Sequence, residues 1–160
     1  MAMDQFLKID DIEGESVDSV HAKTIDVLAW SWGMSQSGTT HMGGGGGSGK
    51  VNVQDLSITK YVDKSSTNLM LACCDGTHFK EALLTVRKAG KTALEYVKIT
   101  MKEVIISSVS TGGSGGEDRL TENVSLNFAE VKVEYTPQKP DGTGDAAKDI
   151  TWKIAENIVG

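Results

Sequence analysis

The chain has 160 residues and a formal net charge of −6, with 22 acidic against 16 basic side chains. This length is sufficient for one domain, over residues 1–160, with a hydrophobic core that needs neither disulfides nor a metal. The acidic balance, without basic clusters interleaved with aromatic residues, argues against nucleic acid as a partner.

Most of the chain has the alternating apolar and polar pattern of β-strands. Val97, Ile99 and Met101, for example, alternate with polar residues, which places them on one face of a strand. Seven or eight strands are predicted, near residues 4–10, 22–35, 51–62, 79–88, 93–109, 119–136 and 148–158. Pro137 and Pro140 follow the strand at 119–136 and indicate a turn rather than a domain linker.

The apolar positions change parity inside several of these segments. In the strand at 119–136, apolar residues stand at even positions up to Phe128 and at odd positions from Val131 onward. An extra residue near Ala129 and Glu130 would produce this change, which is the pattern of a β-bulge. Long bent strands of this kind predict a mainly β fold, either a barrel or an orthogonal two-sheet sandwich.

One short helix is predicted within residues 65–76. Residues 65–68 offer N-cap side chains, residues 69–74 are apolar all round, and Gly76 can adopt the left-handed closing conformation. We expect this helix to be buried on most sides and to cover one open end or face of the barrel.

The cysteine and histidine positions predict neither a disulfide framework nor a metal site. Cys73 and Cys74 are neighbours, and His21, His41 and His78 are far apart in the sequence. The N-terminal residues lack the basic and apolar regions of a secretory signal, and no apolar stretch reaches membrane-spanning length. We therefore expect folding in the cytoplasm, with no cofactor and no membrane insertion.

A glycine-rich segment, residues 41–50 (HMGGGGGSGK), matches phosphate-binding loops only superficially. Gly44, Gly49 and Lys50 fit the start of a P-loop, but Val51 stands where the magnesium-binding hydroxyl is required. The residues that follow have a strand pattern, whereas both the P-loop and the dinucleotide-binding glycine motif open a helix. Nucleotide binding is therefore not predicted.

Residues 112–116 (GGSGG) formally match the nucleophile elbow of hydrolases, with Ser114 as the nucleophile. The next segment is a strand rather than a helix, and no histidine follows His78, so the usual order of serine, acid and histidine cannot be completed. Acidic pairs such as Asp10 with Asp11 are expected to be solvated loop charges. No catalytic residue is predicted, and the chain is not expected to be an enzyme.

Several long stretches carry a more specific signal than these short motifs. They are residues 27–35 (VLAWSWGMS), 41–50, 60–66 (KYVDKSS), 68–72 (NLMLA), 87–90 (RKAG), 107–113 (SSVSTGG) and 117–128 (EDRLTENVSLNF). These stretches resemble the haemolysin-coregulated protein (Hcp) family of the bacterial type VI secretion system, and the resemblance covers essentially the whole chain.

The resemblance implies a phage-tail-tube-like β-barrel with one helix, which assembles as a homohexameric ring. Rings of that family stack into a tube that a sheath propels towards a target cell. The resemblance further implies a tip spike protein and small effectors as partners, with the effectors carried and protected in the lumen. Export by this machine needs no signal peptide.

Two contact sites are predicted within this framework. Ser31 lies between Trp30 and Trp32, so strand alternation turns it away from the aromatic face, towards the lumen or the exterior, and we hypothesise a role in effector contact. The second site is a ring packing or stacking loop, whose glycines cost entropy that contact with a neighbour can offset. Its residues are Ser37, Gly38, His41, Met42, Gly43, Gly44, Gly45, Gly46, Gly47, Ser48, Gly49 and Lys50.

Two other functions are compatible with the same pattern. A phage-tail-tube protein would share the barrel and the hexameric assembly. A family member with a fused toxin is less expected, because the strand at 148–158 runs almost to Gly160 and leaves no room for an added domain.

Overall fold

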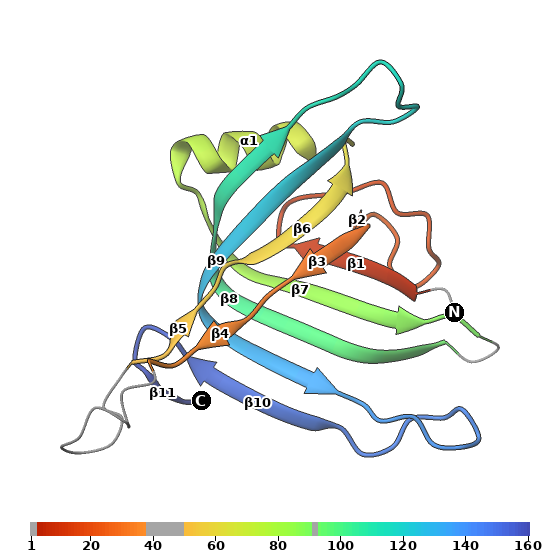
Figure 1. The fold of residues 1–160 in the computed structure, drawn as a ribbon, viewed down its shortest axis with the longest axis vertical. Coiled ribbons are helices and arrows are strands. Elements are labelled where there is room, and N and C mark those ends of the chain that lie inside the picture. Colours follow the sequence, from red (N-terminus) through yellow and green to blue (C-terminus); the bar gives the residue numbers. More distant parts are fainter. Residues whose placement is uncertain (1–2, 38–49, 91–92) are drawn as a thin grey trace.

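The computed structural model describes residues 3–37, 50–90 and 93–160, which are mainly β with one short helix (Figure 1). The strands are β1 (Met3–Ile9), β2 (Ile25–Asp26), β3 (Ala29–Ser31), β4 (Met34–Ser35), β5 (Asn52–Val53), β6 (Leu56–Tyr61), β7 (His78–Lys88), β8 (Leu94–Thr111), β9 (Thr121–Tyr135), β10 (Lys148–Lys153) and β11 (Ile158–Val159). The helix α1 (Ser66–Asp75) lies between β6 and β7 in the sequence. The predicted fold class is confirmed.

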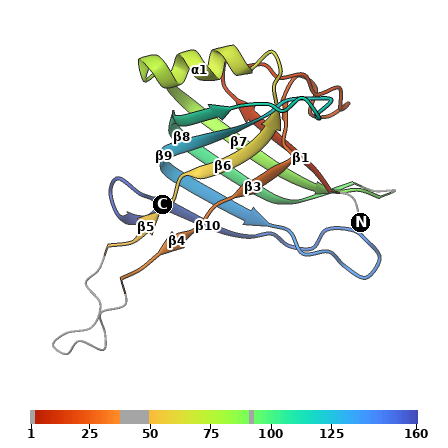
Figure 2. The same cartoon turned by 45° about the horizontal axis from the view of Figure 1, so that its top comes forward.

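The strands form one bent, barrel-like wall and a separate two-stranded sheet. The wall has the order β11-β10-β9-β8-β7-β1-β2, with β6 pairing both β9 and β3, while β4 and β5 make the small sheet. The segment between β2 and β3 crosses the remaining gap. Val27 N donates to Gln5 O of β1 at 2.9 Å, and Leu28 N donates to Thr59 O of β6 at 2.8 Å. One segment thus bridges the wall, although no single ladder closes it, and α1 lies across one end (Figure 2).

The buried positions of both β8 and β9 change parity in midstrand. The buried side chains pass from Phe128 to Val131 in β9 and from Met101 to Val104 in β8. These changes lie opposite each other, because Met101 pairs with Val131 and Val104 pairs with Phe128. Glu103, between the two β8 residues, has a left-handed φ of 54°. Each strand adds one residue at the same level, so the pairing between them is not displaced there.

The predicted parity change in β9 is therefore present, but its effect on the register differs from the predicted bulge. The extra residue near Ala129 does not displace β9 from β8, because β8 contains a matching one. The register shift of this ladder falls instead between Ile106 and Ser108. At the same level β9 changes its other partner, from β6 up to Leu126 to β10 from Glu130. The two halves of β9 thus serve different parts of the wall.

Three predicted strands are interrupted in the structure. The segment predicted at 22–35 forms β2, β3 and β4, because it pairs in turn with β1, β6 and β5. The segment predicted at 51–62 forms β5 and β6. The last predicted strand is divided into β10 and β11 by a turn in which Asn157 has a left-handed φ of 58°. Partner changes of this kind depend on the whole fold, and local alternation does not reveal them.

The helix α1 ends as predicted but is less buried than predicted. Gly76 has a φ of 70°, and its N–H donates to Ala72 O at 3.0 Å, which closes the helix. At the start, the backbone of Ser65 is helical and its side chain makes no capping bond. Leu69 is buried, whereas Leu71 is 61% exposed. The helix therefore buries one face only, and the expectation of burial on most sides was wrong.

A buried polar cluster joins the start of α1 to the wall. Lys60 of β6 and Glu122 of β9 are cross-strand partners whose ion-paired side chains have no exposed surface. Lys60 Nζ also lies 3.0 Å from Asp63 Oδ1, and Ser66 Oγ donates to Glu122 Oε1 at 2.6 Å. Buried charges are tolerated only when they are paired and hydrogen-bonded, and this cluster supplies both kinds of contact where α1 and the two strands meet.

Candidate assembly surfaces

Most of the predicted ring-packing loop lies outside the described residues. This holds for Gly38, His41, Met42, Gly43, Gly44, Gly45, Gly46, Gly47, Ser48 and Gly49. The two ends of the predicted loop, Ser37 and Lys50, are described, and both are exposed. Ser37 follows β4 and Lys50 precedes β5, so the small sheet connects the predicted loop to the wall.

We call residues 32–37 and 50–55, which contain β4 and β5, the hairpin arm. At its root, Gln54 N donates to Gly33 O at 2.9 Å, and Trp32 Nε1 donates to Gln54 O at 2.9 Å. Figure 1 shows the arm leaving the wall at the end where β10 finishes. The arm therefore has internal hydrogen bonds that hold its two strands together.

An apolar groove of about 180 Å³ lies between the hairpin arm and the β9–β10 part of the wall. Its lining residues are Trp32, Met34, Val51, Val53, Val131, Val133, Ile150 and Trp152. Met34 is 53% exposed and Ile150 is 57% exposed, and their neighbours in the groove are all apolar. The Trp152 indole N–H is buried without a hydrogen-bond partner in the described part of the chain, although such groups usually have one. A contiguous apolar surface of this kind typically marks a site of interaction.

Strand β10 borders this groove and has an open edge. It pairs with β9 along Lys148–Lys153, but its pairing with β11 is confined, among the described residues, to Trp152 and Lys153. On the opposite face of this sheet, Lys132 Nζ lies 3.0 Å from Glu134 Oε1, so these charges are matched within the chain. An open strand edge beside apolar side chains is suited to pairing with another polypeptide.

Ser31 is exposed on β3, while Trp30 and Trp32 on either side of it pack against the hydrophobic core. The pairing of four neighbouring strands places one serine from each in a single row. The row consists of Ser31, Ser57, Ser125 and Ser108. The hydroxyls of Ser57 and Ser125 lie 3.3 Å apart. Ser31 therefore belongs to a surface that four strands share, and alternation within one strand could not show this.

The next row across the same strands is also small and uncharged. It consists of Ala29, Thr59, Asn123 and Ser110. Thr59 Oγ1 donates to Asn123 Oδ1 at 2.7 Å. We call the two rows together the hydroxyl face. Hydroxyl and amide groups can donate and accept hydrogen bonds, so this face can contact a polypeptide without a preference for either charge.

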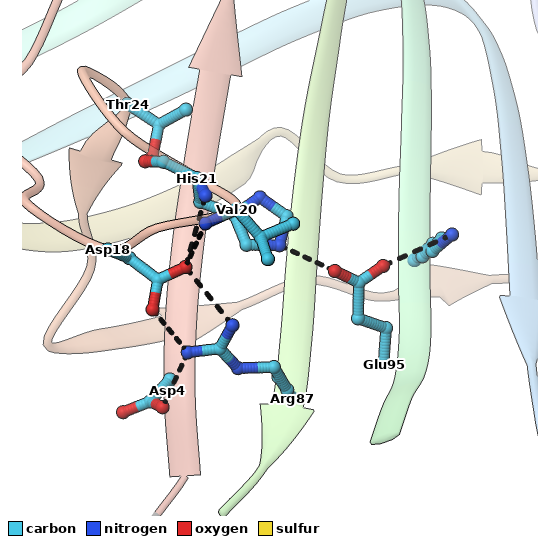
Figure 3. A network of polar contacts seen from close by, with 8 residues as sticks. Asp4, Asp18, Val20, His21, Thr24, Arg87 and Glu95 are labelled. Carbon is cyan, nitrogen blue, oxygen red and sulfur yellow. Dashed lines mark hydrogen bonds and ion pairs between the residues drawn. The ribbon is translucent and has the colours of Figure 1, made fainter. Parts of the chain in front are cut away.

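A network of ion pairs holds the connection between β1 and β2 against the wall (Figure 3). Arg87 of β7 donates to the two carboxylate oxygens of Asp18 at 2.6 and 3.1 Å, and to Asp4 Oδ2 at 3.0 Å. The guanidinium of Arg87 holds the pKa of Asp18 well below its usual range, and Asp18 in turn raises the pKa of Arg87. Both groups therefore stay charged at neutral pH.

His21 extends this network to β8. Its Nε2 lies 2.5 Å from Glu95 Oε1, and its ring stacks on Phe6 with the ring centroids 4.6 Å apart. Burial raises the pKa of Glu95, but the contacts with His21 and Lys98 outweigh it, so the pKa is below its usual value. These residues are far apart in the sequence and match no short motif, so sequence reasoning missed the network.

The residues that superficially matched enzyme motifs do not come together as a site. Ser114 lies in the turn after β8 and is followed by β9 rather than by a helix. Within residues 3–37, 50–90 and 93–160, no group of three or more His, Cys, Asp and Glu side chains is arranged to hold a metal ion. In the same ranges, no helix has the length and apolar character needed to span a membrane.

Several solved structures have the same fold. The chain matches the crystal structure of Hcp1 from Salmonella typhimurium with a TM-score of 0.83 and 39% identity, over the full length of both chains. It matches a type VI secretion system effector from Yersinia pestis with a TM-score of 0.78 and 34% identity, over 94% of this chain and all of the other. A further structure, described as a type six secretion system protein, gives a TM-score of 0.93 at 30% identity over 99% of this chain and all of that one. These likenesses define the class of protein as a barrel-like component of type VI secretion.

The sequence comparisons identify the family. The chain is 65% identical over 160 residues to Protein hcp1 of Pseudomonas aeruginosa (strain PAO1), which covers 99% of both sequences. Residues 6–135 match the family described as "Type VI secretion system effector, Hcp". The chain belongs to the Hcp family of secreted structural proteins, and the resemblance seen in the sequence is confirmed.

Proposed function

We propose that this chain is the structural tube subunit of a type VI secretion system. Its copies form hexameric rings, the rings stack into a tube, and small effectors are carried and protected in the lumen. Its other partners are the sheath and the tip spike protein. Membership of the Hcp family supports this proposal, as does the apolar groove that a single copy, taken as one domain over residues 1–160, leaves exposed.

The observation that carries ring formation is the apolar groove beside the open edge of β10. Met34 and Ile150 expose more than half of their surface there. Covering such surface contributes roughly 25 cal/mol for each Å² removed from water. A strand of a neighbouring copy bonded to the edge of β10 would bring its own side chains over the groove. A contact between two different surfaces of identical copies closes into a ring when the rotation between copies allows it.

The segment from Ser37 to Lys50 is proposed to mediate ring packing or stacking. Its described ends are exposed and continue the hairpin arm away from the wall. Glycine-rich chain loses much conformational entropy when it is ordered, and contact with a neighbouring ring or subunit offsets that cost. Replacing residues 43–47 with a short turn should weaken tube formation, and tubes that form as before would reject this role.

Ser31 is proposed to contact effectors as part of the hydroxyl face. A surface of short, uncharged polar groups offers hydrogen bonds without the strong attraction that would prevent release. The subunit itself performs no catalysis and needs no cofactor. It is made in the bacterial cytoplasm and leaves through the type VI apparatus. A phage-tail-tube function has less support, because the similar proteins are named as type VI proteins.

The experiment that tests the proposal is the solution mass of the purified protein by light scattering, with electron microscopy of the same fraction. The expected result is six times the chain mass of 17.1 kDa, with ring images. A protein that remains monomeric at high concentration, without rings, would overturn ring formation by the chain alone. Addition of a cognate effector then tests cargo binding on the same sample.

A further inference from the structure

Three irregular points of the fold meet at the carboxylate of Asp55. This residue lies between β5 and β6, where the chain passes from the hairpin arm into the wall. Ser107 Oγ of β8 donates to Asp55 Oδ2 at 2.6 Å, and Asn127 Nδ2 of β9 donates to Asp55 Oδ1 at 2.8 Å. Each oxygen of the carboxylate thus has its own donor, and each donor comes from a different strand.

Both donors occupy special positions in their strands. Ser107 falls in the register shift of the β8–β9 ladder, between Ile106 and Ser108, so it is the extra residue of β8 at that point. Asn127 comes directly after Leu126, the last β9 residue paired with β6, and before β9 reaches β10. A regular ladder does not fix the geometry at a bulge or at a change of partner. A side-chain contact such as that of Asp55 can fix it.

Asp55 supplies a directional polar link between the root of the hairpin arm and strands β8 and β9. The bonds of Gln54 with Gly33 and with Trp32 hold the two strands of the arm to each other. These bonds set the shape of the arm, and the apolar packing of Trp32 and Val53 on the core holds its root against the wall. Where the arm faces β9 and β10, the apolar side chains leave a groove open between them. Apolar contact is not directional, whereas the two hydrogen bonds of Asp55 are.

We propose that Asp55 is the positioning residue of the hairpin arm. Through its hydrogen bonds with Ser107 and Asn127, the carboxylate of Asp55 sets the direction of the arm relative to the wall. This assignment deepens the proposed function and rests on it for one consequence only, the effect on assembly. The arm leads to Ser37 and Lys50, the described ends of the ring-packing segment. A small rotation at the root of the arm displaces these ends, so Asp55 controls where that segment meets a neighbour.

Three variants separate this role from a general effect on stability. Asp55→Ala removes both acceptors. The reciprocal exchange of Asp55→Asn with Asn127→Asp restores an amide–carboxylate bond with its polarity inverted. The matched control is Thr59→Val, which removes the exposed 2.7 Å bond between Thr59 and Asn123 on the same wall but touches neither the arm nor Asp55. Should Asp55→Ala fail to fold, Ser107→Ala removes one donor and serves in its place.

The direct measurement is hydrogen–deuterium exchange of the backbone amides at the arm root, above all Gln54 N. Loss of hydrogen bonds to a charged carboxylate is expected to make Asp55→Ala exchange there about tenfold faster, while the β7–β8 ladder is unchanged. Thr59→Val should exchange at the wild-type rate. In the double variant with Asp55→Asn and Asn127→Asp, the rate should return towards the wild-type value. Unchanged exchange at the root in Asp55→Ala, or no recovery in the reciprocal variant, would overturn the assignment.

Assembly is measured separately, by light scattering on the same proteins. The expected result is that Asp55→Ala loses ring or tube mass, whereas Thr59→Val and the reciprocal variant retain it. Faster exchange with unchanged assembly would overturn the consequence for ring packing. If the wild type itself stays monomeric, the proposed ring fails, but the exchange experiment still decides whether Asp55 directs the arm.

Discussion

Lys60 of β6 and Glu122 of β9 face each other across neighbouring strands with both side chains completely removed from solvent. The second carboxylate oxygen, Glu122 Oε2, has no hydrogen-bond partner among the described residues. The negative charge therefore depends on contacts at one oxygen, where Lys60 supplies the cation and Ser66 a hydroxyl. Removal of that cation should therefore destabilise the contact between α1 and the strands beneath it.

Replacing Lys60 with methionine tests this dependence. Lys60→Met leaves Glu122 as a buried, unpaired carboxylate, and breaking such a pair typically costs about 3–5 kcal/mol of unfolding free energy. The double variant Lys60→Met with Glu122→Leu removes both charges and should recover most of the loss. Unfolding in denaturant measures both values. Equal losses of unfolding free energy in the single and double variants would show that the unpaired charge of Glu122 is not the cause.

Acid sensitivity is expected to arise in part from Asp18. Arg87 holds the folded-state pKa of Asp18 far below the unfolded value of about 3.9. Because the folded pKa is the lower one, the stabilisation is fully present above the unfolded pKa and is lost as the pH falls towards the folded pKa. Asp18→Asn should therefore be less stable than the wild type at neutral pH and should lose less additional stability on acidification from about pH 5 to about pH 3. Unfolding midpoints at these pH values provide the check, and parallel curves for the two proteins would contradict it.

Gly14 should not accept a side chain. A Cβ there would lie 2.4 Å from Thr24 O and 2.7 Å from Ile25 Cα, and both of these are backbone atoms. Gly14→Ala is expected to cost about 1–3 kcal/mol, as overpacking does. At Gly112 a Cβ would meet nothing within 4 Å, so Gly112→Ala should stay within about 0.5 kcal/mol of the wild type. Thermal or denaturant unfolding of the pair measures this, and similar losses in both would remove the steric explanation.

A bulky side chain at Ser31 should reduce effector retention without breaking the ring. Ser31→Phe places an aromatic ring on the hydroxyl face, where it covers the neighbouring hydroxyls and removes their hydrogen bonds to cargo. Thr67→Phe, on the exposed side of α1, adds the same bulk away from that face. Co-purification of an effector with the assembled protein compares the two. Equal retention in both variants would take Ser31 out of the contact site.

A charge at Ile150 should prevent ring assembly while the chain stays folded. Ile150 is 57% exposed, so a lysine there can reach water in a single copy but would be desolvated under a neighbour. Val17→Lys is the control, because Val17 is 97% exposed and is not part of the groove. Circular dichroism reports folding, and light scattering reports mass. Normal rings from Ile150→Lys would mean that no copy covers the groove.

The parts of the fold that were predictable from the sequence are those that local pattern determines. Long alternating segments predicted β7, β8 and β9 closely, and Gly76 predicted the end of α1. The division of residues 22–35 into three short strands was not predictable, because it follows from three successive strand partners. Lys60 was missed as a core residue for a similar reason, since its burial depends on Glu122 from another strand.

The candidate surfaces also have one part that local pattern predicts and another that depends on the whole fold. Alternation around Trp30 and Trp32 was sufficient to turn Ser31 away from the core. The groove was not predictable, because its lining comes from four segments that only the fold brings together. The contacts of Asp55 were not predictable either, since they depend on a register shift in β8 and a change of partner in β9.

The matched extra residues of β8 and β9 couple the lengths of the two strands. Deletion of Glu103 alone would leave the extra residue of β9, near Ala129, without a counterpart in β8, as a one-sided bulge. Only a second deletion, near Ala129, would bring the two strands back into agreement. Residue-for-residue pairing at this level therefore depends on the lengths of both strands, and the bend of the wall belongs to the pair rather than to either strand.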